Sequence, residues 1–340
     1  MFRKAIIGGL VASVLSFIFL FYQLYIPAYQ AKTPIIIDIP KGSSVQDISH
    51  RLYEAGLTRN TWAFYYYTRY KKLGPELKAG AFRINPGLNM VKLLNVLVTE
   101  NGIANLVRVV IPEGFSVNDI AHRLGKLNMV NEQDFSTYVH NHAKADLIQD
   151  FPFLSQIPVS TLEGYLFPDT YFFDKNANKK QIVRAMLREF EKQIMPLWEA
   201  NTAPKDSPKA RFNMHQVATI ASLIEKEAML RTEMSTISSV FYNRLKKKML
   251  LGSDPTVVYA MGKRYKERVL YRDTRIDSPY NTYRYTGFPP SPISSFGVAA
   301  FKASLSPRQT NLYFFFANND GSHTFTKTYK DHLRLQRKNN

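Results

Sequence analysis

Two stretches of the chain share one pattern of apolar and polar positions. Residues 39–52 read IPKGSSVQDISHRL and residues 111–124 read IPEGFSVNDIAHRL, so that ten of fourteen positions are identical. A β-rich run precedes each copy, and a Pro-x-Gly turn leads to a serine, Ser44 or Ser116, with an acid three residues later. That spacing is typical of a helix-capping box, and apolar residues follow at helical spacing. Each copy therefore predicts a strand, a turn and an amphipathic helix.

Similar patterns predict elements along the rest of the chain. From residue 160 onward the sequence becomes rich in tyrosine, proline and short motifs, with helical periodicity in its middle. The predicted fold is α+β, with a helical core embedded in the C-terminal half. The predicted helices are 62–70, 89–98, 178–200, 214–230 and 233–248, and the predicted strands include 78–84 and 313–317.

The N-terminus has a long apolar run. No charged residue occurs between Ala5 and Ile26, and that length is enough to cross the ~30 Å hydrocarbon layer of a membrane. The basic pair Arg3-Lys4 precedes the run, which favours a cytoplasmic N-terminus. A cleaved signal peptide is the alternative, although the run exceeds the usual apolar core of about 7–15 residues. We expect a single-pass anchor at 5–26 in the inner (cytoplasmic) membrane, with residues 1–4 cytoplasmic and the rest of the chain periplasmic or otherwise extracytoplasmic.

Three parts are expected after the anchor. Residues 34–105 are predicted to form a small α+β domain, residues 106–155 to hold the second repeat as a linker region, and residues 156–333 to form a C-terminal α+β catalytic domain. The strand–turn–helix unit resembles the LysM module, a small domain whose groove binds N-acetylated sugars. The alternative is a plain α+β packing unit that binds no ligand, and the residues favour neither.

Composition narrows the classes of chemistry. The chain of 340 residues has no cysteine, which excludes disulfides, cysteine nucleophiles and thiolate metal sites and suits an oxidising compartment. Its formal charge of +18 is compatible with nucleic acid, anionic lipid or an acidic polymer. Because no nucleic-acid-binding motif or phosphate loop is present, we expect no nucleic-acid partner. His140 and His142 lack a convincing third ligand, so we expect no metal and no cofactor.

The stretch ATIASLIEKEAML, residues 218–230, places two carboxylates against an apolar helix face. On a helical wheel Glu227 aligns with the bulky apolar side, whereas Glu225 lies beside small residues on the other border. Both are at the margin of burial, Glu227 slightly deeper, and periodicity does not choose between them. In the simplest interpretation both carboxylates are solvated. A carboxyl on an apolar rim would instead have a raised pKa, which a general acid needs near neutral pH.

Six motifs accompany this helix in a fixed order. Together with the Glu-Lys-Glu sequence they resemble the YceG-like, or MltG, family of endolytic murein transglycosylases, over residues 35–333. A single motif would be weak evidence, whereas six in order are specific. The motifs are LEGYLFPDTY (162–171), VFYNRL (240–245), SDPTVVY (253–259), SPYNTY (278–283), GFPPSPI (287–293) and GSHTF (321–325).

The resemblance implies cleavage of the β-1,4 bond between N-acetylmuramic acid and N-acetylglucosamine in peptidoglycan. It also implies one catalytic glutamate, the first of the Glu-Lys-Glu sequence, which is Glu225 here. One carboxyl can protonate the glycosidic oxygen and then deprotonate the C6 hydroxyl of the same muramic acid. A 1,6-anhydro ring then forms without water, and the second carboxylate of ordinary glycosidases is dispensable. Peptidoglycan synthases, penicillin-binding proteins among them, are the protein partners that the resemblance suggests.

Further residues are candidates for substrate binding. In the SPYNTY motif the tyrosines suit stacking on sugar rings and the asparagine suits N-acetyl groups, although a tyrosine-rich turn would explain the motif equally well. The serine and aspartate of SDPTVVY would either line the cleft or cap the next helix. The histidine of GSHTF would either bond the substrate or be a core histidine with satisfied hydrogen bonds. These candidates are Ser253, Asp254, Tyr280, Asn281, Tyr283 and His323.

Two other functions compete with the transglycosylase. One is a hydrolytic muramidase in which Glu225 is the acid and Asp254 or Glu163 activates water. Glu163 also has a structural interpretation, as the glutamate of a capping box that begins at Ser160. The other is a non-catalytic scaffold that binds peptidoglycan. The chain departs from the usual family pattern beside the expected cleft, at Gly252, Ser291 and Ser295–Gly297.

Overall fold

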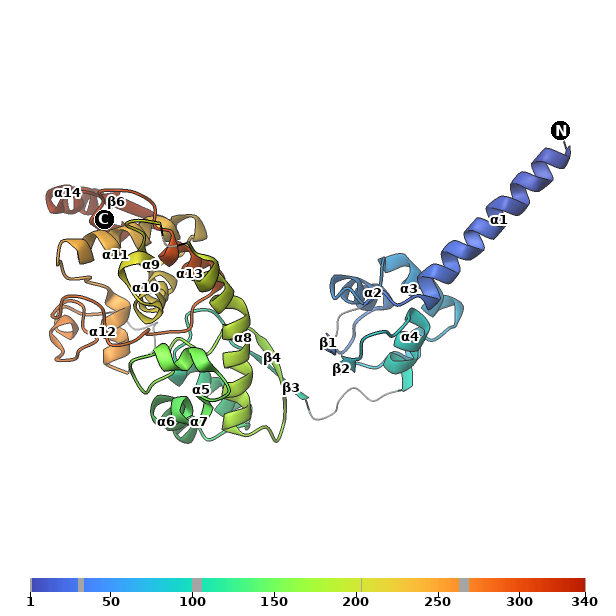
Figure 1. The fold of residues 1–340 in the computed structure, drawn as a ribbon, viewed down its shortest axis with the longest axis horizontal. Helices are drawn as coiled ribbons and strands as arrows, with labels where there is room; N and C mark the ends of the chain where they lie inside the picture. The colour runs from blue at the N-terminus through green and yellow to red at the C-terminus, as the bar shows by residue number, and fades with distance from the viewer. Residues whose placement is uncertain (1, 30–33, 100–105, 203, 263–268, 340) are drawn as a thin grey trace. The chain divides into compact units, whose positions relative to one another are not determined.

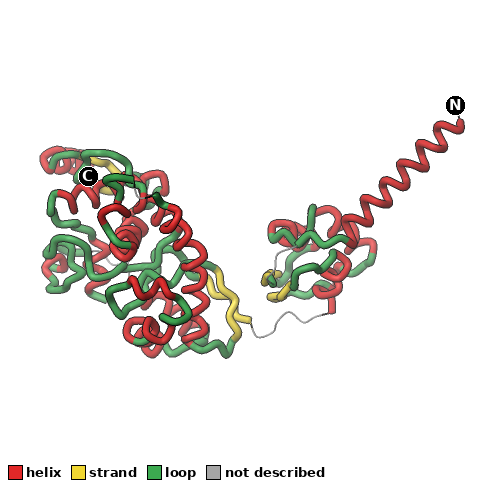
Figure 2. The backbone as a smooth tube through the Cα atoms, in the orientation of Figure 1, coloured by secondary structure: helices red, strands yellow, loops and turns green. Residues whose placement is uncertain are grey.

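Two compact units make up the chain, Met1–Val107 and Arg108–Asn340, and each is described by itself. Helices and short sheets occur in both, so the α+β class predicted from the sequence is confirmed. Figure 2 shows how little of the described chain is strand compared with helix and loop. The computed structural model describes residues 2–29, 34–99, 106–202, 204–262 and 269–339, with side chains from residue 13 to residue 338.

The first unit packs helices against a two-stranded sheet. Its strands β1 and β2 are antiparallel, with Ile35 opposite Ile84. Fully buried side chains such as Leu52, Phe64 and Leu97 fill the core between sheet and helices. The element order after the first helix is strand, helix, helix, strand, helix. The elements are α1 (Phe2–Tyr25), β1 (Ile35–Ile39), α2 (Val45–Glu54), α3 (Thr61–Tyr70), β2 (Gly80–Ile84) and α4 (Met90–Thr99).

Helix α1 covers most of the apolar run that predicts an anchor. The side chains of residues 5–12, which open that run, lie outside the described part of the chain. Within the part that is described, no helix combines the length and the apolarity that a membrane crossing requires.

The second unit is arranged around one buried helix, α10 (Met214–Glu227). Figure 1 shows α10 among α9, α11 and α13, and it packs closely against α11 and α13. A capping box at Asn213 begins α10, and every side chain from Val217 to Ile224 is buried. The other helices are α5 (Val117–Lys126), α6 (Glu132–Asn141), α7 (Ala143–Leu147), α8 (Lys179–Ala200), α9 (Pro208–Arg211), α11 (Met234–Lys246), α12 (Asp254–Ala260), α13 (Val298–Leu305) and α14 (Tyr329–Asn339), and the strands are β3 (Leu106–Val110), β4 (Thr170–Asp174), β5 (Phe314–Ala317) and β6 (His323–Thr326).

Both copies of the repeat fold as predicted, as a strand, a turn and a helix. The hydroxyl of Ser44 accepts the N–H of Asp47 at the start of α2, and Ser116 accepts that of Asp119 at the start of α5. Each aspartate in turn accepts the N–H of its serine, which completes the capping box. In the second turn Gly114 has a φ of 81°, a conformation that only glycine adopts without strain.

The turn of the second repeat is bound into the second unit by backbone hydrogen bonds. Ile111 donates to the carbonyl of Asp169, and Gly114 donates to the carbonyl of Ser295, both at 2.9 Å. Ser295 donates back to Phe115 at 2.7 Å. Strand β3, which precedes this turn, also pairs with β4, a strand much later in the sequence. From Arg108 onward, the stretch predicted as a linker region lies in the same compact unit as α10.

Candidate active site

The Glu-Lys-Glu sequence ends α10, and its three side chains meet different neighbours. An α-helix has 3.6 residues per turn, so consecutive side chains point about 100° apart. Lys226 donates from Nζ to the carbonyl of Gly114 at 3.0 Å, which ties α10 to the turn of the second repeat. Glu225 faces the start of α13. Glu227 faces a cavity.

Glu227 is partly buried and has one hydroxyl partner. The hydroxyl of Ser253 donates to Glu227 Oε1 at 2.5 Å. Burial raises the pKa of Glu227 to about 7, and the nearby Asp254 adds to this rise, whereas the Ser253 bond and the charge of Arg244 oppose it. A carboxyl with such a pKa exists in both protonation states near neutral pH. It can therefore give a proton and take one back.

The cavity beside Glu227 has a volume of about 830 Å³, within the usual range of roughly 300–1,000 Å³ for small-molecule sites. One wall comes from the end of α11 and the loop before α12. A second part of the lining comes from β5, β6 and α14. The lining residues are Glu227, Met229, Arg244, Met249, Leu250, Gly252, Asp254, Tyr283, Phe314, Phe315, Phe316, Ala317, His323, Tyr329, His332 and Gln336.

Several predicted substrate-binding residues gather at this cavity. Asp254 and Tyr283 line it, and the Tyr283 hydroxyl donates to Asp254 Oδ1 at 2.6 Å. Ser253 precedes α12, but its side chain makes no capping bond to that helix. Ser253 therefore occupies the N-cap position of α12 without a side-chain capping bond, because its hydroxyl donates to Glu227 instead.

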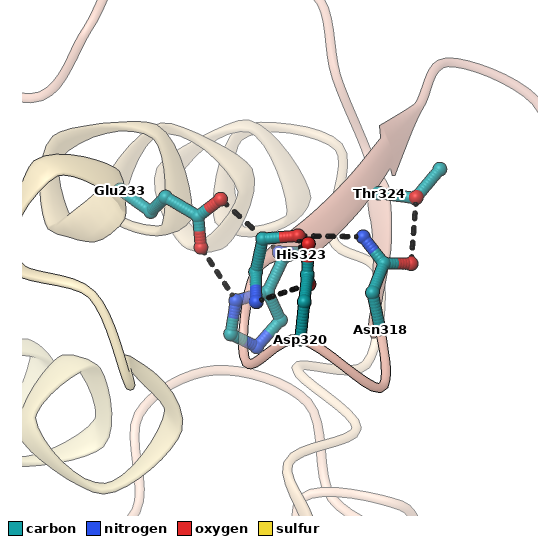
Figure 3. Close-up of polar contacts among 6 residues, drawn as sticks. Glu233, Asn318, Asp320, His323 and Thr324 are labelled. Atoms are coloured by element: carbon teal, nitrogen blue, oxygen red, sulfur yellow. Dashed lines mark hydrogen bonds and ion pairs between the residues drawn. The ribbon is translucent and has the colours of Figure 1, made fainter.

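His323 also lines the cavity, at the start of β6. Figure 3 shows its ring facing Glu233 beside the turn that joins β5 to β6. The ring nitrogen Nδ1 lies 2.7 Å from Glu233 Oε2, and the backbone N–H of His323 donates to Glu233 Oε1 at 3.1 Å. Glu233 thus fixes the orientation of the imidazole on the cavity wall.

Tyr280 and Asn281, from the same motif as Tyr283, do not line this cavity. The Asn281 side chain is fully buried and donates to the carbonyls of Thr274 and Ile276, at 2.9 and 2.7 Å. The Tyr280 hydroxyl shares a hydrogen bond of 2.7 Å with the hydroxyl of Ser291. In this structure both residues hold the loop that presents Tyr283.

Glu225 has surroundings of a different kind. Its Oε2 accepts the N–H of Gly297, just ahead of α13, at 2.9 Å. Glu113 of the second repeat packs on the same glycine, where a Cβ would lie 1.8 Å from Glu113 Oε1, and Arg231 donates to Glu113 at 3.1 Å. Burial raises the pKa of Glu225, the Gly297 bond opposes that rise, and the charge of Glu113 adds to it. Glu225 lines neither the large cavity nor one of about 420 Å³ beside Glu113.

Glu163 is not part of a capping box at Ser160, because no helix begins there. Its carboxylate is buried and accepts the N–H of Val117, the first residue of α5, at 3.0 and 3.1 Å. Glu163 therefore stabilises the start of a helix distant in sequence. Burial raises its pKa to about 8, and the Val117 bond opposes that rise.

Sequence reasoning missed much of the cavity wall. Arg244 lies in the VFYNRL motif, whose sequence indicates no role for it, and its Nε donates to the carbonyl of Tyr313 at 2.6 Å. The aromatic run of β5 predicts only a strand, and the sequence analysis predicts no helix at α14. The sequence does not show that these residues line one cavity, because that depends on which segments come together in the fold. Among the described residues, no cluster of His, Asp and Glu is arranged to hold a metal ion.

The fold and the site define an α+β protein whose buried helix ends at a large cavity with a protonatable carboxyl. The sequence model of the YceG-like family matches residues 37–338. The chain therefore belongs to the YceG-like family.

Similar proteins are known from three bacteria. An endolytic murein transglycosylase from Bacillus subtilis is 36% identical over 317 residues, covering 91% of this chain and 85% of the relative. One from Streptococcus pneumoniae is 31% identical over 330 residues, and the match covers 89% of this chain but only 58% of that longer protein. The 2.6 Å crystal structure of a YceG-like protein from Listeria monocytogenes is 33% identical, with 90% of this chain and 99% of that chain covered and a TM-score of 0.62.

Proposed function

We propose that the chain is an endolytic murein transglycosylase, like the relatives that bear this name. Its substrate is the glycan strand of nascent peptidoglycan, and the bond cleaved is the β-1,4 bond between N-acetylmuramic acid and N-acetylglucosamine. One observation supports this reaction above all others: a carboxyl with a pKa of about 7 borders a cavity of about 830 Å³. A proton donor at a site of that size is what glycosidic cleavage requires.

The two glutamates at the end of α10 compete for the proton transfers. The family resemblance assigns them to Glu225, whereas the surroundings favour Glu227. Glu227 lines the cavity together with Asp254 and Tyr283, whereas the Glu225 carboxylate accepts a backbone N–H of Gly297. We therefore assign the proton transfers to Glu227, and Glu225 is the alternative to be tested against it.

The proposed reaction needs one carboxyl in two states. Protonated Glu227 gives its proton to the glycosidic oxygen, the bond from that oxygen to C1 of muramic acid breaks, and C1 becomes oxocarbenium-like. The carboxylate then takes the proton of the C6 hydroxyl, whose oxygen bonds to C1. The 1,6-anhydro ring closes, Glu227 is protonated again, and no water is consumed. The hydroxyl of Ser253 holds the carboxylate in place through both steps.

Hydrolysis is the second candidate reaction, because Asp254 lines the same cavity. In that reaction Asp254 would activate a water molecule that attacks C1. The Tyr283 hydroxyl that donates to Asp254 Oδ1 at 2.6 Å would compete with such a water. A non-catalytic scaffold would bind the glycan in this cavity without turnover.

The reaction is tested by incubating the purified chain with peptidoglycan and analysing the soluble products by mass spectrometry. A transglycosylase releases fragments with 1,6-anhydromuramic ends. A muramidase releases fragments with reducing ends, each heavier by one water. Reducing ends alone would replace the proposed reaction with hydrolysis, and intact strands that remain bound would leave only the scaffold.

The proposal also places the enzyme at the inner membrane. The charge-free run from Ala5 to Ile26 would anchor it, with residues 34–105 as a LysM-like domain and residues 156–333 as the catalytic domain outside the cytoplasm. Peptidoglycan synthases, penicillin-binding proteins included, are the proposed protein partners. Fractionation of the full chain tests the anchor, since recovery in the soluble fraction would contradict it.

A further inference from the structure

Helix α14 forms one wall of the Glu227 cavity, and the proposed reaction makes no use of it. Tyr329, His332 and Gln336 of this helix line the cavity together with Phe314 and Phe316 of β5. The side chain of Tyr329 is 60% exposed. A large aromatic ring that borders a cavity and stays open to solvent is unusual for a packing residue, because burying such a ring is favourable.

The aromatic rings behind Tyr329 hold it against the wall. Its ring centre lies 5.6 Å from that of Phe314, and it stacks on His332 at 6.1 Å with an interplanar angle of 18°. The centre of the His332 ring lies 5.7 Å from that of Phe314 and 5.4 Å from that of Phe316. These contacts order a side chain that would otherwise lose conformational freedom on binding a ligand.

The described residues of β5 and α14 that line the cavity are apolar, aromatic or neutral. The guanidinium of Arg244 is held over the ring of Phe314 at 5.4 Å and donates to the backbone of Tyr313 and Leu251. Burial lowers the pKa of His332, so its imidazole is neutral at neutral pH, and Nδ1 has no hydrogen-bond partner within the described residues. Gln336 adds a neutral amide. Aromatic faces and neutral hydrogen-bonding groups suit the face of a sugar ring better than an acidic peptide.

We propose that α14 provides a sugar subsite of the glycan cleft, in which the exposed face of Tyr329 stacks on the C–H face of an N-acetylated pyranose ring. The inference rests on the proposed function, because it takes the glycan strand as the ligand. Arg244 Cζ lies 5.4 Å from the ring of Phe314, and that ring lies 5.6 Å from Tyr329, so Tyr329 is within about 11 Å of the guanidinium that borders Glu227.

The test measures binding of intact strands. In a full-length Glu225→Gln/Glu227→Gln background both candidate proton donors are absent, and the probe is glycan strands stripped of peptide stems. When Tyr329→Ala is introduced into this background, calorimetric titration should give a Kd about tenfold higher than that of the background alone, in line with the loss of one aromatic stacking contact. Added Tyr329→Phe keeps the ring and should bind as the background does. Tyr271 is 78% exposed and outside the cavity, so Tyr271→Ala is the matched control and should not change the Kd.

Each outcome decides one claim. An unchanged Kd for Tyr329→Ala, an equal loss for Tyr271→Ala, or no binding of stem-free strands to the background overturns the subsite. A loss confined to strands that retain their peptide stems overturns it as well, since the ligand would then be the peptide. If the wild-type chain fails to cleave peptidoglycan while Tyr329→Ala still weakens binding, the proposed reaction falls and the subsite stands.

Discussion

Glu225 and Glu227 are separated by one residue, and the two ends of that short segment differ in what they face. Oε2 of Glu225 accepts the N–H of Gly297, and the charges of Glu113 and Arg231 lie nearby. The Glu227 carboxyl has a hydroxyl partner and borders a large open volume. A carboxylate that accepts a backbone N–H is engaged within the fold, whereas one beside an open cavity can contact a ligand. The elements packed against the two glutamates therefore distinguish carboxyls that the helical wheel places at similar depth.

Lys226, between the two glutamates, extends the contrast. Its ammonium donates to the carbonyl of Gly114 in the turn of the second repeat. Glu113 of the same turn packs on Gly297. Two of the three residues in Glu-Lys-Glu thus connect α10 to the repeat and to α13, and the third is left to face the cavity.

A large effect is expected on the pH dependence of the reaction. Burial raises the pKa of Glu227 to about 7, so the protonated form that acts as the acid disappears above this pH. The value of kcat/KM should fall about tenfold for each further pH unit, and Glu225→Gln should keep the same alkaline limb. A flat profile between pH 7 and 9, or loss of the limb only in Glu225→Gln, would move the acid away from Glu227.

Glu225 should matter for stability more than for chemistry. In Glu225→Ala the N–H of Gly297 loses its acceptor, and we expect urea unfolding to show a loss of about 1–2 kcal/mol. Turnover should fall less than about tenfold at a temperature where the variant is folded. Glu225→Gln keeps an acceptor oxygen and should recover most of the stability; equal losses in both variants would argue against this structural role.

Ser253 offers a finer test of the Glu227 side. Its hydrogen bond lowers the pKa of Glu227, so Ser253→Ala should move the alkaline limb to higher pH. The rate on the acidic side should fall less than about tenfold, because the carboxyl itself remains. Steady-state kinetics measured across pH report both effects. The control is Ser253→Thr, which keeps a hydroxyl. A limb shifted to lower pH would contradict the observed bond.

The smallest effect concerns stability and a third buried glutamate. Glu163 has a pKa raised by burial to about 8, above its unfolded value of about 4.3. A raised pKa contributes stability in full below the unfolded value, and this contribution is lost as the pH rises toward about 8. Unfolding free energy should thus decline between about pH 5 and 8, and less steeply in Glu163→Gln. An equal decline in that variant would show that the carboxyl is already charged in the folded state across this pH range.

Local signals in the sequence predicted the elements well. The two capping boxes and the turn glycines specify each strand–turn–helix unit within about a dozen residues, and both units formed as expected. Helices 178–200 and 214–230 also correspond to α8 and α10. Such features depend on neighbours in the chain, so periodicity and capping chemistry are enough to predict them.

The site was harder to predict because its contacts are distant in sequence. The helical wheel placed Glu225 and Glu227 at similar depth, and only the arrival of Gly297 on one side and Ser253 on the other distinguishes them. The pairing of Glu163 with Val117 and the use of α14 as a cavity wall depend on tertiary packing in the same way. The pattern of residues within one segment does not predict contacts between segments that are distant in sequence.

The most direct measurement compares peptidoglycan cleavage by the Glu227→Gln and Glu225→Gln variants, with 1,6-anhydromuramic products quantified by mass spectrometry. Both substitutions keep the size of the side chain and remove one ionisable carboxyl. Removal of a general acid typically costs about 10²–10⁴ in rate, so Glu227→Gln should lose product formation by at least about a hundredfold, whereas Glu225→Gln should retain more than about a tenth of wild-type activity. A near-normal Glu227→Gln beside an inactive Glu225→Gln would contradict the assignment and return the proton transfers to Glu225.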